Sequence, residues 1–151
     1  MKNKKKNNDK IGSVLVIGGG IGGMQTSLDL VDSGFKVYLL EKKPNIGGVM
    51  AQLDKTFPTN DCSMCIMAPK LVEVGRNPNI EIITRAELER FEGEAGNFTA
   101  TLRKHPQYMD PDKCTGCGLC AQSCPVELID EYNEGLTLNN AISILYPQGV
   151  P

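Results

Sequence analysis

The fold of this chain is decided by residues 13–23, which read Ser-Val-Leu-Val-Ile-Gly-Gly-Gly-Ile-Gly-Gly. The apolar run Ser13–Ile17 is typical of a buried parallel strand, and it leads directly into a glycine turn. Apolar residues at helical spacing follow until Ser33-Gly34, and a second apolar strand is expected over Lys36–Leu40. The pattern predicts a βαβ unit with a right-handed crossover, and therefore an α/β fold.

Three glycines at the predicted turn, Gly18, Gly20 and Gly23, form a G-x-G-x-x-G motif. In dinucleotide-binding βαβ units the first glycine allows the tight turn, the second lets a pyrophosphate approach the backbone, and the third lets the helix pack closely on the strand. Ile21 and Gly22 open the helix, where unpaired N–H groups attract phosphate. A purely structural glycine turn is the alternative, but the strand, the helix and the second strand follow one another at the spacing expected of a dinucleotide-binding unit.

An acidic residue, Glu41, ends the second predicted strand, where a carboxylate accepts hydrogen bonds from the adenosine ribose. This acid argues against NADP, because it would repel the 2'-phosphate. Glu41, Lys42 and the later pair Gly47-Gly48 resemble the E-(x)n-GG run of flavoproteins that bind FAD through an N-terminal βαβ unit. In those proteins the second glycine pair lets the backbone pass near the diphosphate and the flavin, so the resemblance implies FAD.

The segment after Gly48 contains the first cysteine pair. Pro58 excludes a regular helix around it, and Asp61 is suited to cap a helix that begins at Cys62. We expect Pro69 to begin a new helical turn, with Gly75 as its stop.

Cys62 and Cys65 lie three residues apart, so on a helix they share one face. Three interpretations remain open for them. They are a redox dithiol close to the flavin, or ligands of an iron-sulfur cluster completed by cysteines elsewhere, or a buried and inert pair. The run that follows Cys65 also looks like the end of the motif of disulfide-reducing flavoenzymes, whose cysteine pair faces the isoalloxazine ring.

The second group of cysteines, Cys114, Cys117, Cys120 and Cys124, has the spacing C-x2-C-x2-C-x3-C-P of bacterial ferredoxins and predicts a [4Fe-4S] site. A zinc site or a disulfide knot is the alternative, but zinc sites pair two separated C-x2-C hooks. In two-cluster ferredoxins the fourth cysteine ligates the other cluster. The motif therefore reads as half of a two-cluster module, and the fourth thiolate of the first cluster comes from elsewhere unless Cys124, or a cysteine of the first pair, substitutes.

The remaining chain completes the expected organisation. A strand is predicted over Asn79–Thr84, and an antiparallel hairpin over Leu88–Glu92 and Phe98–Leu102, with Phe91 and Phe98 in the hairpin core. We expect a disordered basic tail at residues 1–10, an incomplete FAD-binding Rossmann-like domain at 11–104, a partial ferredoxin-like module at 105–130, and a C-terminal tail at 131–151.

Composition narrows the function classes. The chain has 151 residues and a formal charge of -2, which gives no reason to expect nucleic acid as a partner. No apolar run approaches the roughly 20 residues of a membrane-spanning helix, and the lysine-rich start has no apolar region of a signal peptide. Six cysteines in two short clusters indicate a reducing compartment, so we expect a cytoplasmic protein.

Taken together, these motifs closely resemble those of the heterodisulfide reductase A-subunit family. The glycine motif, Glu41 and Gly47-Gly48 carry the resemblance, as do residues 57–65, residues 69–76 and the ferredoxin run. Its members provide the flavin and iron-sulfur component of the complex that reduces the coenzyme M and coenzyme B heterodisulfide in methanogens. Relatives in other anaerobes include the corresponding component of a quinone-interacting oxidoreductase. Family members are several times longer, so the chain is expected to be a fragment.

The resemblance implies electron transfer between FAD and [4Fe-4S] clusters toward partner subunits, one of which reduces the disulfide. It also implies an electron-donating hydrogenase or dehydrogenase as a partner, and the flavin as the proposed site of electron bifurcation. Two further hypotheses remain open. One is a self-contained FAD-dependent dithiol oxidoreductase that uses Cys62 and Cys65, and the other is a non-enzymatic fragment that docks on partner subunits.

Overall fold

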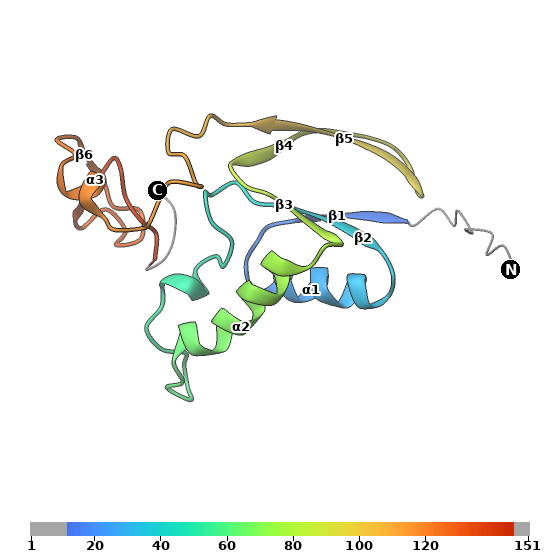
Figure 1. Cartoon of the computed structure of the whole chain (residues 1–151), viewed down its shortest axis with the longest axis horizontal. Helices are drawn as coiled ribbons and strands as arrows, with labels where there is room; N and C mark the ends of the chain where they lie inside the picture. The colour runs from blue at the N-terminus through green and yellow to red at the C-terminus, as the bar shows by residue number, and fades with distance from the viewer. Residues whose placement is uncertain (1–11, 147–151) are drawn as a thin grey trace, which may run out of the picture.

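A computed structural model describes residues 12–146 (Figure 1). Its centre is a three-stranded parallel sheet in the order β1-β2-β3, formed by β1 (Ser13–Ile17), β2 (Lys36–Leu40) and β3 (Ile80–Ile83). Helix α1 (Ile21–Asp32) connects β1 to β2, which confirms the predicted βαβ unit. The predicted basic tail at 1–10 lies outside the described residues, as do residues 147–151.

The end of α1 follows the sequence signals. Ser33 is the C-cap, and Gly34 has a φ of +90°, the left-handed conformation that glycine adopts easily after a helix. β1 lies at one edge of the sheet, and among the described residues it pairs only with β2.

Helices α1 and α2 (Ser63–Arg76) cover the same face of the sheet (Figure 1). The core between the layers is apolar and almost fully buried; its members include Met24, Leu28, Val37, Leu39, Met67, Val74 and Ile80. A short 3-10 helix, η1 (Met50–Gln52), contributes the buried Ala51 from the connection between β2 and α2. The opposite face of the sheet carries no helix among residues 12–146.

The prediction that Pro69 starts a new helical turn and that Gly75 stops it was wrong. α2 runs without a break through both residues and ends at Arg76, with Asn77 as its C-cap. A proline inside a helix costs about 3 kcal/mol. Met67 and Val74 are both fully buried, on either side of Pro69, and burying two such side chains offsets that cost because each contributes about 1.5–3 kcal/mol.

Two antiparallel pairs complete the structure. β4 (Ala86–Glu94) and β5 (Asn97–Lys104) form a hairpin and confirm the predicted one, although both strands are longer than expected. The rings of Phe91 and Phe98 stack with centroids 4.7 Å apart, and each is about half exposed. The two phenylalanines therefore contact each other on the hairpin.

The cysteine-rich part contains α3 (Leu119–Gln122) and a second small sheet of β6 (Glu127–Ile129) and β7 (Leu138–Asn140). β7 lies in the stretch for which the sequence suggested only a tail. In Figure 1 this part lies at the end of the parallel sheet where β2 ends, which is the side on which α/β sheets bind ligands.

Candidate functional site

The predicted glycine turn joins β1 to α1. Gly18 has a φ of +101°, and its N–H donates to the carbonyl of Leu40 at 2.7 Å, which ties the turn to the end of β2. A Cβ at Gly23 would lie 1.8 Å from the carbonyl oxygen of Gly18, so the close approach of helix and strand requires glycine there. At Gly20 and Gly22 an added Cβ meets nothing within 4 Å, so the turn faces open space.

The second glycine pair lies directly against this turn. The N–H of Gly47 donates to the carbonyl of Gly19 at 2.7 Å, and Gly47 forms a parallel bridge with Gly20. Gly48 has a φ of +61°, and a Cβ built on it would lie 3.0 Å from the Cα of Gly20. The structure thus brings together the two glycine segments that the sequence assigned to one cofactor.

Glu41 lies at the end of β2 and is buried, with 8% of its surface exposed. One carboxylate oxygen accepts the N–H of Gly19 at 2.7 Å, and the other accepts the N–H of Lys43 at 2.8 Å. The sequence predicted a ribose acceptor at this position, and the structure shows that the carboxylate of Glu41 holds the glycine turn. Lys42, which follows it, is exposed.

These residues fit the diphosphate of a dinucleotide. Gly20 is the N-cap of α1, and no side chain caps that end of the helix or places an acid in its first turn. The first N–H groups of α1, from Ile21 onward, therefore remain available to an anion. The surrounding glycines leave no side chain between the backbone and the open space at Gly20.

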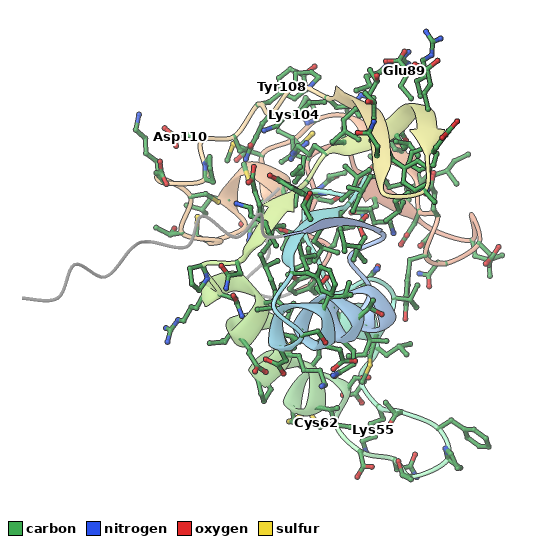
Figure 2. The ribbon with its side chains drawn as sticks, turned by 90° about the vertical axis from the view of Figure 1, so that its right-hand side faces the viewer. Lys55, Cys62, Glu89, Lys104, Tyr108 and Asp110 are labelled. Carbon is green, nitrogen blue, oxygen red and sulfur yellow. A yellow bond between two sulfur atoms is a disulfide. The ribbon has the colours of Figure 1, made fainter. Side chains whose placement is uncertain are left out.

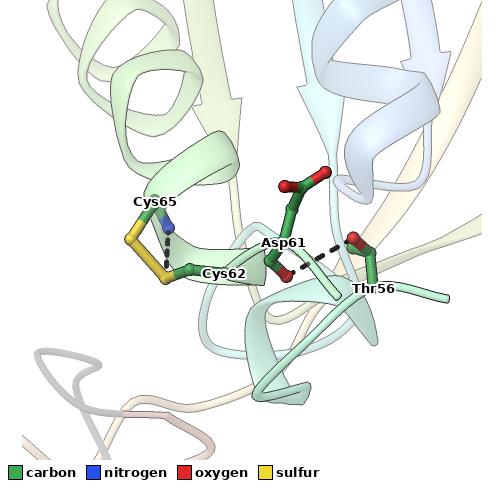
Figure 3. Close-up of a disulfide and its surroundings, with 4 residues drawn as sticks. All are labelled: Thr56, Asp61, Cys62 and Cys65. Carbon is green, nitrogen blue, oxygen red and sulfur yellow. Dashed lines mark hydrogen bonds between the residues drawn. A yellow bond between two sulfur atoms is a disulfide. The ribbon is translucent and has the colours of Figure 1, made fainter. Parts of the chain in front are cut away.

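Cys62 and Cys65 form a disulfide at the start of α2, and both residues are exposed (Figure 3). Exposure shows that the alternative of a buried, inert pair was wrong. Cys62 is itself the N-cap, and its sulfur accepts the N–H of Cys65 at 3.2 Å, so the expected cap at Asp61 was also wrong. The next residue, Ser63, is fully buried, and its hydroxyl has no hydrogen-bond partner among the described residues.

The predicted iron-sulfur cysteines lie in a separate loop. Cys114, Cys117 and Cys120 line one small cavity of about 150 Å³. Gly116 and Gly118 take φ values of +67° and +77°, in the left-handed region, and let the backbone wrap around this cavity.

The electrostatic surroundings of Cys117 suit a metal ligand. The backbone of Leu119 and the side chain of Thr115 hydrogen-bond its sulfur and lower the pKa of the thiol. A lowered pKa favours the thiolate, which is the form that metals bind.

Cys124 does not line that cavity. Its sulfur lies 3.6 Å from the carbonyl of Val126, and backbone hydrogen bonds from Ile142 and Val126 lower the pKa of its thiol. The three-plus-one arrangement fits a cluster held by the first three cysteines. Among residues 12–146, no group of three or more His, Cys, Asp or Glu side chains is arranged to hold a single metal ion.

The two cysteine groups are far apart in this structure. Figure 2 shows Cys62 at the opposite end of the molecule from Asp110, whose carbonyl accepts the N–H of Cys114 at 3.0 Å. The structure therefore does not bring Cys62 or Cys65 to the cavity as a substitute fourth ligand.

Comparisons with known proteins agree with these two sites. Residues 16–73 match the family model of an NAD(P)-binding Rossmann-like domain, and residues 108–130 match that of a 4Fe-4S binding domain. The chain is 58% identical over 137 residues to the second iron-sulfur A subunit of CoB--CoM heterodisulfide reductase from Methanopyrus kandleri. It is 56% identical over 137 residues to the A subunit of H(2):CoB-CoM heterodisulfide,ferredoxin reductase from Methanothermobacter thermautotrophicus.

This chain is homologous to part of the heterodisulfide reductase A subunit. Each of the two matches covers 91% of this chain and 21% of the relative, so the chain spans about a fifth of the length of these proteins. Among solved structures it is similar to L-proline dehydrogenase from P. horikoshii, with a TM-score of 0.49, 24% identity, and coverage of 64% of this chain and 20% of that chain.

The predicted relationship to the heterodisulfide reductase A subunit and the Rossmann-like α/β fold are confirmed. The expected [4Fe-4S] cluster agrees with the 4Fe-4S match, and a dinucleotide at the glycine turn agrees with the Rossmann-like match. No helix in the described part of the chain is long and apolar enough to cross a membrane.

Sequence reasoning missed the contacts of residues 141–146 with both sites. The hydroxyl of Tyr146 donates to the carbonyl of Ile46 at 2.9 Å, beside the second glycine pair, and Ile144 lines the cysteine cavity. Neither residue belongs to a motif. The apolar character of residues 142–146 was the only available signal. It predicts that these residues are buried, but it does not predict which segment they pack against.

Proposed function

We propose that this chain is the electron-transfer part of a heterodisulfide reductase-type subunit, with FAD at the glycine turn and a [4Fe-4S] cluster at the cysteine loop. FAD exchanges electrons singly or in pairs and a [4Fe-4S] cluster exchanges them singly, so the two together connect pair transfer to single-electron transfer. The protein supplies binding, orientation and the surroundings that set the potentials.

At the glycine turn, the backbone at Gly18 and Gly20 binds the diphosphate against the N-terminus of α1. Glu41 accepts hydrogen bonds from the ribose with the lone pairs that its two backbone bonds leave free. Ile21, Gly22, Lys42 and the Gly47-Gly48 pair complete the proposed site.

At the cysteine loop, Cys114, Cys117 and Cys120 bind the cluster as thiolates. The backbone and Thr115 contacts of Cys117 stabilise negative charge on its sulfur. We propose Cys124 as a ligand of a second cluster, because its sulfur is held at Val126 and Ile142 instead of in the cavity.

One observation carries this proposal: both cofactor segments adjoin the same end of the parallel sheet. A cavity of about 720 Å³ lies between the Rossmann-like part and the cysteine-rich part, lined by Lys43, Val49 and Gln52 from the first and by Leu128 and Tyr132 from the second. The contact between the two parts supports electron exchange between two cofactors within one chain.

The test is anaerobic reconstitution of the chain with iron, sulfide and FAD. We expect a yellow protein with flavin and cluster absorbance, four iron and four sulfide per cluster, and dithionite reduction of both. Cys117→Ser should remove the cluster and leave the flavin. A chain that takes up neither cofactor would instead support a fragment that only docks on partner subunits.

A second candidate function rests on the exposed disulfide. A Cys62–Cys65 disulfide that accepts two electrons and two protons becomes a dithiol, as in an FAD-dependent dithiol oxidoreductase. Thiol titration of flavin-loaded protein before and after reduction separates the two candidates. If Cys62→Ser keeps full disulfide turnover, this second candidate is excluded.

For the partners, we propose other subunits of a heterodisulfide reductase-type complex and an electron-donating hydrogenase or dehydrogenase. A cytoplasmic, anaerobic role in methanogenesis is the proposed setting, supported by the names and methanogen sources of the relatives. A quinone-interacting oxidoreductase is the alternative complex. Co-purification with tagged candidate subunits tests these assignments.

A further inference from the structure

Residues 141–146 run from the cysteine-rich part to the segment that contains the second glycine pair. At one end, the N–H of Ala141 donates to the carbonyl of Val126 at 2.8 Å, and the backbone of Ile142 hydrogen-bonds the sulfur of Cys124. In the middle, Ile144 lines the cavity that Cys114, Cys117 and Cys120 share. At the other end, Tyr146 reaches the segment that contains Gly47. We refer to residues 141–146 as the strap.

Tyr146 joins two distant segments of the chain through a hydrogen bond. The residue is partly buried and packs against the main hydrophobic core, and its hydroxyl donates to the carbonyl of Ile46 at 2.9 Å. Burial raises the pKa of this phenol, so the hydroxyl keeps its proton and remains a donor. The two hydrogen-bonded residues are 100 positions apart in the sequence, so the contact fixes one part of the chain on the other.

The carbonyl of Ile46 and the N–H of Gly47 belong to the same peptide group. That N–H donates to the carbonyl of Gly19 at 2.7 Å, and the carbonyl of Gly19 in turn shares a peptide group with the N–H of Gly20. The result is a continuous chain of hydrogen bonds from the hydroxyl of Tyr146 to the N-cap of α1. Such chains polarise their members, so each bond strengthens the next.

Side-chain packing supports the same connection. A Cβ at Gly19 would lie 2.8 Å from Cγ2 of Ile46, so the Ile46 side chain rests directly on the turn. Movement of the peptide group between Ile46 and Gly47 is therefore transmitted to the backbone that faces the open space at Gly20.

We propose that Tyr146 is a positioning residue through which the cysteine loop controls dinucleotide binding at the glycine turn. Filling the cysteine cavity fixes Ile144, which fixes the strap and holds Tyr146 on the carbonyl of Ile46. This inference rests on the proposed function, since it takes FAD and a cluster as the ligands of the two sites. By linkage, the cluster strengthens FAD binding by the same factor by which FAD strengthens cluster binding.

Tyr132 provides a matched control, because it too belongs to the cysteine-rich part and its hydroxyl faces a backbone carbonyl of the Rossmann-like part. The hydroxyl of Tyr132 lies 3.5 Å from the carbonyl of Gln52, and Tyr132 is half exposed. Its removal also deletes a hydroxyl between the two parts, but that hydroxyl does not reach the peptide group between Ile46 and Gly47. Tyr146→Phe and Tyr132→Phe therefore differ in the contact that the proposal requires.

The test compares the full chain with and without a reconstituted cluster, in wild type and in both variants. FAD affinity is measured by quenching of flavin fluorescence under anaerobic conditions. We expect the cluster to strengthen FAD binding about 5-fold or more in wild type and in Tyr132→Phe, since couplings between sites span roughly 5–150-fold. Tyr146→Phe should bind FAD with an affinity that no longer depends on the cluster, although its cluster content is unchanged.

A second readout does not need FAD. Amide hydrogen exchange over residues 44–50 is expected to slow when the cluster is present, in wild type but not in Tyr146→Phe. If wild type binds no FAD at all, the proposed function fails, and the exchange experiment still tests the strap. Equal cluster dependence of exchange in wild type and Tyr146→Phe, or equal cluster dependence of FAD affinity, would overturn the inference.

Discussion

Replacing Gly23 with alanine tests the close contact between β1 and α1. A Cβ at this position would lie 1.8 Å from the carbonyl oxygen of Gly18, whereas real Cβ atoms essentially never come within 3.0 Å of another heavy atom. The two groups must therefore separate by at least 1.2 Å, the difference between these two distances. The obstacle is backbone, so no side chain can turn away to make room.

Neighbouring Gly22 provides the matched control, because a Cβ there meets nothing within 4 Å. Both substitutions gain the same helix propensity, about 1 kcal/mol. Only Gly23→Ala adds overpacking, which costs about 1–3 kcal/mol and occasionally more. We expect the overpacking in Gly23→Ala to cost about 3 kcal/mol of folding stability, because Gly18 is also hydrogen-bonded to Leu40 and cannot shift without disturbing β2.

The assay is urea unfolding followed by far-ultraviolet circular dichroism. With slopes of about 1–3 kcal/mol per molar urea, a difference of about 3 kcal/mol separates the two midpoints by about 1 M or more. Gly22→Ala should unfold at or above the wild-type midpoint, and Gly23→Ala well below it. Equal midpoints for the two variants would refute the packing argument.

Three further outcomes are expected. Glu41→Gln should lower the free energy of unfolding by about 1.5–3 kcal/mol, because an amide cannot accept both backbone N–H groups; an unchanged urea midpoint would contradict this. Reduction of the exposed Cys62–Cys65 disulfide should add two titratable thiols without loss of circular dichroism. Cys62→Ser should lower the free energy of unfolding by no more than about 2 kcal/mol, because the loop that the disulfide closes is short. Loss of the fold on reduction or in the variant would contradict this expectation. Burial raises the pKa of Tyr146, so the stabilisation that its hydroxyl provides should be fully present below about pH 10 and lost as the pH rises through the raised pKa. The unfolding free energies of wild type and Tyr146→Phe should differ by about 1 kcal/mol at neutral pH and by less in alkali. A difference that stays constant with pH would be inconsistent with a hydrogen bond from the Tyr146 hydroxyl.

The first βαβ unit was predictable almost to the residue. Its signals are local: Ser13–Ile17 is an uninterrupted apolar run, and Gly18, Gly23 and Gly34 each satisfy a backbone requirement within a few residues. The path of α2 was not predictable in this way. Pro69 is a strong local signal to end a helix, and it is overridden by tertiary burial of Met67 and Val74.

The candidate sites also combine features that local sequence predicts with features that only tertiary packing determines. The residue types and spacing of the cysteine loop predict its cofactor, because the ligand chemistry is contained within one short run. Sequence could not reveal that Glu41 holds the glycine turn through Gly19, or that Tyr146 reaches Ile46, because these contacts depend on how distant segments pack. Hydrogen bonds of that kind leave no periodic pattern.

The position of β1 at the edge of the parallel sheet affects how the chain behaves in solution. Within residues 12–146, only β2 pairs with it, and its other side presents backbone N–H and C=O groups beside the exposed side chain of Ile17. An open, apolar edge of this kind is a template for another strand. Self-association of the isolated chain should therefore increase with protein concentration, and any added segment that pairs with β1 should act as a solubilising cap.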